Sequence, residues 1–99
     1  MARKPLDKAE IEEGLRAEVL DLPEPLRRFF ARVAVEVHPA ICAESPGTLF
    51  IVAKSGNRAI FYDDVEEDFG IGTLDAGKSL KDCSLIGELR FAVLRLQGG

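Results

Sequence analysis

The stretch Thr48–Phe69, TLFIVAKSGNRAIFYDDVEEDF, decides the fold of this chain. It opens with an apolar run on both faces of an extended backbone, which predicts a strand covered on both sides. A Ser-Gly-Asn turn at 55–57 follows, and then a second apolar run. The sequence therefore predicts a buried β-hairpin with strands over 48–54 and 58–63, and helices must cover it.

The residues before this hairpin have the spacing of two helices. Asp7, with Glu10 three residues later, is typical of a capping box, and apolar residues at helical spacing follow, which predicts a helix over 7–20. A Leu-Pro-Glu-Pro segment then ends that helix and starts a second one over 24–36, because proline is tolerated in a first helical turn. The β-branched residues at 33–37 also fit a strand, so the end of the second helix stays open.

The residues after the hairpin are less decisive. Residues 70–82 are rich in Gly, Asp, Lys and Ser, and we expect them to be irregular, with a short third strand near 71–75. Residues 84–97 fit a helical stripe, and strand alternation nearly as well; we favour the helix because its stripe spans more residues. The predicted fold is one α+β domain over 1–99, with two N-terminal helices and a C-terminal helix packed on a small antiparallel sheet. Two strands alone are marginal, so we expect a third strand or pairing between copies.

Composition and charge limit the possible partners. The chain is 46% apolar and 30% charged, as in an ordinary globular protein. Its formal net charge of -4 argues against a nucleic-acid binder, which needs a basic face. No run approaches the roughly 18 apolar residues of a membrane span, and the basic N-terminus lacks the apolar run of a secretory signal. We therefore expect a cytoplasmic protein that binds neither nucleic acid nor membrane.

The two cysteines and the one histidine do not predict a chemical site. Cys42 and Cys83 are expected to be free, partly buried thiols, since the cytosol is reducing. A catalytic thiol would need His38 as its base, and no sequence feature brings them together. His38 precedes Pro39 and fits the end of a helix better. The wide spacing of these residues lacks a paired-ligand signature, so no metal and no cofactor is expected.

Residues 72–79, Gly-Thr-Leu-Asp-Ala-Gly-Lys-Ser, match the phosphate-loop pattern G-x-x-x-x-G-K-[ST]. A working phosphate loop lies between a buried strand and a long helix. Here the preceding segment is short and glycine-rich, and Asp82-Cys83 would interrupt the helix. We interpret the pattern as a chance match and expect no enzyme. The matching residues are Gly72, Gly77, Lys78 and Ser79.

The C-terminal residues 93–99, VLRLQGG, resemble the tail of ubiquitin and its relatives, and residues 77–82 resemble the segment before ubiquitin's last strand. The resemblance implies conjugation through the carboxylate of Gly99, where bare glycine backbone threads a narrow enzyme channel. The rest of the chain departs from that family, because a β-grasp fold opens with a hairpin and this chain opens with helices. Gln97 also replaces the usual basic residue. A conjugated modifier is therefore the alternative function.

Five acidic residues occupy six positions after the second strand. Asp64, Glu66 and Asp68 weakly match a calcium loop, but Phe69 stands where that loop needs glycine. Crowded, solvated acids also lack the distinct environments that acid–base catalysis requires. We expect an acidic surface with an aromatic anchor that binds a basic protein partner. The expected binding residues are Tyr62, Asp63, Asp64, Glu66, Glu67 and Asp68.

Residues 53–57 and 61–69, with Leu74-Asp75 and Gly77, are similar to a group of short bacterial proteins. That group shares a helical N-terminal part, a hairpin, an aromatic–acidic Asp-Val-Glu-Glu stretch and a C-terminal Glu-Leu-x-x-Ala-Leu-like helix, which 88–94 partly match. The resemblance implies no function. In size, charge and layout the chain also resembles the small α+β immunity proteins that bind basic toxin domains. The leading hypothesis is a non-enzymatic protein-binding module, monomeric or homodimeric.

Overall fold

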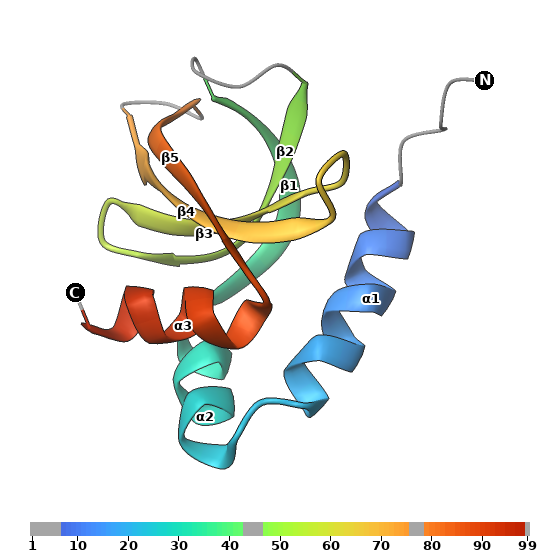
Figure 1. Cartoon of the computed structure of the whole chain (residues 1–99), viewed down its shortest axis with the longest axis vertical. Coiled ribbons are helices and arrows are strands. Elements are labelled where there is room, and N and C mark those ends of the chain that lie inside the picture. Colours follow the sequence, from blue (N-terminus) through green and yellow to red (C-terminus); the bar gives the residue numbers. More distant parts are fainter. Residues whose placement is uncertain (1–6, 43–46, 76–78, 99) are drawn as a thin grey trace.

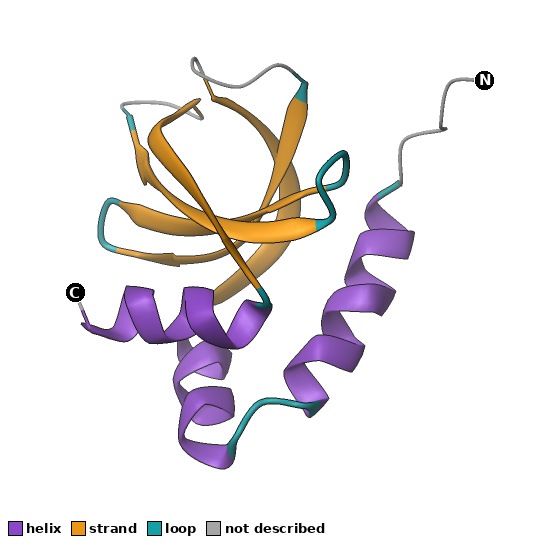
Figure 2. Cartoon of the chain, viewed as in Figure 1, coloured by secondary structure: helices purple, strands orange, loops and turns teal. Residues whose placement is uncertain are grey.

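The computed structural model describes residues 7–42, 47–75 and 79–98, and it contains a five-stranded barrel with three helices (Figures 1 and 2). Each strand pairs antiparallel with the next, and β5 pairs parallel with β1 to close the barrel. The elements are α1 Lys8–Leu20, α2 Glu24–Val33, β1 Ala34–Cys42, β2 Thr48–Ser55, β3 Arg58–Asp63, β4 Asp68–Leu74, β5 Ser79–Gly87 and α3 Leu89–Gly98. The α+β class and the predicted helix order are confirmed.

The first helix begins where the capping box predicted it. The Asp7 Oδ1 accepts a hydrogen bond from the Glu10 backbone N–H at 2.9 Å, and the Glu10 Oε1 accepts one from the Asp7 N–H at 3.2 Å. The second helix ends earlier than the predicted 24–36, because Ala34 adopts extended backbone with ψ 139°. From Ala34 onward the β-branched residues form β1, so the strand alternative was correct at this boundary.

Two apolar clusters lie on the two faces of the barrel wall. Ile51 and Phe61 belong to the cluster inside the barrel, whereas Val52 and Ile60 belong to a cluster that includes side chains from all three helices. Residues 49–53 are apolar on both faces because each face meets one of these clusters. The predicted hairpin of β2 and β3 is therefore confirmed as the wall shared by both cores.

The short third strand predicted near 71–75 is confirmed as β4, whereas residues 79–82, which were expected to be irregular, belong to β5. Gly70 and Gly72 lie where neighbouring atoms leave little room for a side chain. A Cβ on Gly70 would lie 2.5 Å from Phe61 Cζ, and one on Gly72 would lie 3.1 Å from Cys83 Sγ. The predicted helix over 84–97 was wrong in its first part: β5 continues to Gly87 and α3 begins at Leu89.

The prediction of free thiols was also wrong, because Cys42 and Cys83 form a disulfide. Cys42 lies on β1 and Cys83 on β5, the two strands whose pairing closes the barrel. The cysteines are 41 residues apart in sequence. Only barrel closure brings the two cysteines together, and local sequence patterns do not predict that closure.

α2 and α3 lie at one end of the barrel, and α1 runs along its side (Figure 1). α3 contacts α2 and the strands β3, β4 and β5, while α1 contacts β1 and α2. In the described ranges, no helix combines the length and the apolar character needed to cross a membrane.

Candidate functional site

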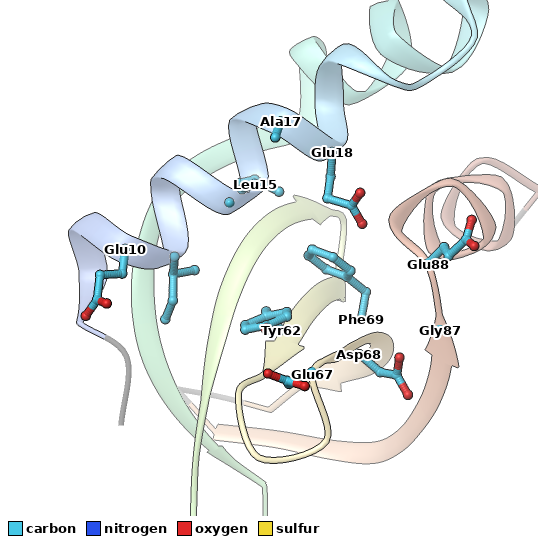
Figure 3. A pocket seen from close by; sticks show the side chains of 12 residues that line it. Glu10, Leu15, Ala17, Glu18, Tyr62, Glu67, Asp68, Phe69, Gly87 and Glu88 are labelled. Carbon is cyan, nitrogen blue, oxygen red and sulfur yellow. The ribbon is translucent and has the colours of Figure 1, made fainter. Parts of the chain in front are cut away.

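A pocket of about 370 Å³ lies between α1, the β3–β4 turn (residues 64–67) and the junction of β5 with α3 (Figure 3). We call it the acidic pocket. Its floor residues are Ile11, Leu15, Tyr62 and Phe69, and its rim residues are Glu10, Glu18, Glu67, Asp68 and Glu88. A volume of this size accommodates a small ligand or a single side chain of a partner.

The floor is apolar and largely aromatic. Tyr62 on β3 and Phe69 on β4 are register partners, and their ring centroids lie 5.0 Å apart with the ring planes tilted by 53°. Ile11 and Leu15 lie one helical turn apart on α1, so both side chains face the same direction. Ile11 is buried in the cluster shared with the helices, and this contact holds α1 against the site.

Five acidic residues from three parts of the chain line the pocket, but the Glu10 carboxylate caps α1 and points away from the rings (Figure 3). Figure 3 shows the carboxylates of Glu18, Glu67, Asp68 and Glu88 around the two aromatic rings. None of the described lining residues carries a positive charge, although Arg90 pairs with Glu88 at 3.2 Å from outside the lining. The pocket therefore combines a strongly negative rim with an aromatic face.

An ion pair fixes the start of α1 against the barrel. The Lys8 Nζ lies 2.6 Å from the Glu36 Oε1 on β1, and their hydrogen bond raises the pKa of Lys8 and lowers the pKa of Glu36. Both side chains are exposed to solvent, so the pair orients the helix and adds little to stability.

The β3–β4 turn is built by a buried aspartate. The Asp63 Oδ1 accepts hydrogen bonds from the backbone N–H groups of Val65 at 2.9 Å and Glu66 at 3.2 Å. The Asp63 carbonyl oxygen accepts another from the Glu67 N–H at 2.7 Å, and Glu67 has left-handed backbone with φ 59°. Asp63 thereby sets the position of Glu67 and Asp68 at the pocket rim.

Three of the six residues predicted to bind a partner line the acidic pocket: Tyr62, Glu67 and Asp68. The other three do not. Asp63 and Asp64 are each only 7% exposed, and Glu66 is exposed but outside the lining.

Sequence reasoning missed Glu10, Glu18 and Glu88, which complete the rim. The available signal was on α1, where Glu10, Gly14 and Glu18 follow one another at four-residue spacing and so share a helix face.

No match to this chain is found among protein-family models, curated proteins or solved structures. The geometry of the acidic pocket therefore carries the functional proposal.

The remaining sequence candidates lie elsewhere. Of the residues that match the phosphate-loop pattern, Gly72 lies inside β4 and Ser79 begins β5, while Gly77 and Lys78 lie outside the described residues. A strand therefore follows the pattern, where a phosphate loop needs a helix. His38 lies within β1, not at a helix end as predicted, with its Nδ1 2.8 Å from the Glu36 carbonyl oxygen.

The tail and the carboxylates also bear on function. α3 continues to Gly98, so the tail is helical as far as it is described, and Gly99 lies outside the described residues. Within the described ranges, no three His, Cys, Asp or Glu side chains converge on a metal position.

Proposed function

We propose that the protein is a non-enzymatic protein-binding module whose acidic pocket holds a lysine or arginine side chain of a partner protein. The observation that carries this proposal is the set of four carboxylates, those of Glu18, Glu67, Asp68 and Glu88, around the Tyr62–Phe69 floor. An ammonium or guanidinium group is attracted both by carboxylates and by an aromatic face.

The apolar part of the floor suits the rest of such a side chain. Lysine and arginine carry a long aliphatic stem below the charged head, and stems of this kind pack on apolar surface. Ile11 and Leu15 supply that surface beside the rings. The net charge of -4 adds a longer-range attraction toward a basic partner.

We propose binding over catalysis because the described lining residues offer negative charge and an aromatic face but no nucleophile with an adjacent base. We also prefer this function to conjugation through the diglycine tail, since residues 93–98 belong to α3 instead of an extended segment. A cytoplasmic location stays a prediction. The disulfide argues against this location, because disulfides are rare in the reducing cytosol.

A matched pair of charge reversals on α1 tests this proposal. Glu18 lines the acidic pocket, whereas Glu13 is exposed on the same helix outside the lining. The probe is the peptide acetyl-Gly-Lys-Gly-amide, compared with the same peptide carrying an Nε-acetylated lysine. Binding is followed by NMR through the ring signals of Tyr62 and Phe69.

We expect the lysine peptide to shift both ring signals and the acetylated peptide to leave them unchanged. Glu18→Lys should weaken binding at least tenfold, which corresponds to about 1.4 kcal/mol, while Glu13→Lys should weaken it much less. Added salt should also weaken binding, because the rim is open to solvent. Equal binding of the two peptides, or equal effects of the two reversals, would contradict the proposal.

A further inference from the structure

A second surface groove of about 650 Å³ lies between the start of β3 and the C-terminal half of α3. In Figure 1 the C-terminal half of α3, which lines this groove, lies on the opposite side of the barrel from α1, which lines the acidic pocket. The described lining residues of the groove are Arg58, Ile86, Phe91, Leu94, Arg95 and Gly98, and we call it the basic groove. We propose that it binds a small apolar carboxylic acid, with Arg58 and Arg95 holding the carboxylate.

The strongest observation is an unmet donor on Arg58. Its Nη1 atom is buried and has no hydrogen-bond partner among the described residues. A buried polar group without a partner destabilises the protein, and more so when the group is charged. The guanidinium fork presents N–H groups in the geometry that a carboxylate accepts in pairs. A carboxylate bound against the Arg58 side chain, which lines the groove, is the kind of acceptor that this donor lacks.

The charge of the groove supports the same ligand class. It contains two arginines and no acidic residue among its described lining residues, in a chain of net charge -4. The C-terminal end of α3 opposes an anion with a partial charge of about -0.5. Two full positive charges outweigh this partial charge, so the groove as a whole favours an anion.

The other walls specify an apolar body attached to that anion. Phe91 and Leu94 on α3 are 46% and 48% exposed, and Ile86 lies beside them at the end of β5. Inorganic anions would leave this apolar surface in contact with water. An aliphatic or aromatic chain covers it, and the removal of apolar surface from water favours binding.

The groove suits a small molecule better than an extended peptide. Peptides commonly add a strand to an unpaired sheet edge, but here the strands close into a barrel. The groove volume lies within the range of small-molecule sites. This inference does not depend on the proposed function of the acidic pocket.

Calorimetry with octanoate and 1-octanol tests the proposal, because the two probes share one chain length and differ in the carboxylate. We expect octanoate to bind at least tenfold more tightly than octanol. Arg58→Gln should weaken octanoate binding at least tenfold and Arg95→Gln by a smaller factor. Arg58→Lys should also weaken it, because lysine keeps the charge but lacks the fork. Arg16→Gln, on exposed α1 outside the groove, is the matched control and should change nothing.

Circular dichroism establishes that each variant is folded. A folded Arg58→Gln variant with unchanged octanoate affinity would overturn the proposal. Octanol binding as tightly as octanoate would also overturn it. A third outcome would assign the groove to a peptide instead of a small acid. In that case acetyl-Leu-Leu would bind through its C-terminal carboxylate, and octanoate would bind no better than octanol.

Discussion

At the scale of single residues, Gly70 is the described glycine with the least room for a side chain. It lies on β4 opposite Phe61 of β3, and an added Cβ would meet both the Phe61 ring and the Ser84 carbonyl oxygen of β5. Gly14, in the middle of α1, is the opposite case, because nothing lies within 4 Å of an added Cβ. A side chain is therefore excluded by close packing at Gly70, whereas no neighbouring atom excludes one at Gly14.

This difference predicts opposite signs for one substitution. Gly70→Ala should lower the free energy of unfolding by roughly 1–3 kcal/mol, because it overpacks the barrel interior. Gly14→Ala should raise it by about 0.5–1 kcal/mol, since alanine loses less backbone entropy in a helix. Urea denaturation of both variants measures the two effects. A neutral Gly70→Ala variant would contradict the close packing at β4.

At the scale of elements, the β3–β4 turn links the fold to the acidic pocket. Asp63 holds the turn through its side chain and its carbonyl oxygen, and Glu67 and Asp68 follow at the rim. An acidic residue in the same run thus has one of two tasks. Buried Asp63 shapes the backbone, whereas Glu67 and Asp68 lie at the rim of the acidic pocket.

Substitutions at Asp63 separate these tasks. Asp63→Ala removes the acceptor for two backbone N–H groups and should lower the free energy of unfolding by roughly 1–3 kcal/mol. Asp63→Asn keeps an acceptor oxygen and should recover most of that loss. Glu66→Ala, at an exposed position in the same turn, should stay within about 0.5 kcal/mol of the parent protein. Thermal or urea denaturation measures all three, and equal losses for Ala and Asn would disprove the role of the Asp63 oxygen.

At the scale of the whole molecule, barrel closure depends on a short parallel seam. β1 and β5 pair only at Ile41↔Ser79 and Cys42↔Leu80 among the described residues. The Cys42–Cys83 disulfide crosslinks the same two strands across 41 residues of sequence. A crosslink over a loop of this length restricts the unfolded chain and so stabilises the closed barrel.

Reduction of this bond should lower the free energy of unfolding by about 2–4 kcal/mol. The measurement is urea denaturation with and without a phosphine reductant. A variant with both Cys42→Ala and Cys83→Ala is the control, and its stability should not respond to the reductant. If the parent protein is equally insensitive, the crosslink does not contribute to barrel stability.

The acidic pocket was predictable in part. Tyr62, Glu67 and Asp68 are close together in the sequence, so the aromatic–acidic run indicated them directly. Glu10 and Glu88 are 78 positions apart in numbering (88 minus 10). They line one pocket only because α1 and the β5–α3 junction pack beside the same turn. Asp63 and Asp64 appeared equivalent to their neighbours, and only the folded turn distinguishes buried acids from exposed ones.

The sequence alone determined the elements whose causes are local: the capping box at Asp7, the hairpin of β2 and β3, and the α+β class. Local patterns suffice there because caps, turns and side-chain periodicity involve residues a few positions apart. Only the tertiary structure decided the closure of the barrel, the disulfide, the strand role of Gly70 and the composition of the two charged sites. These depend on contacts between residues distant in sequence, whose positions are fixed only when the whole core packs.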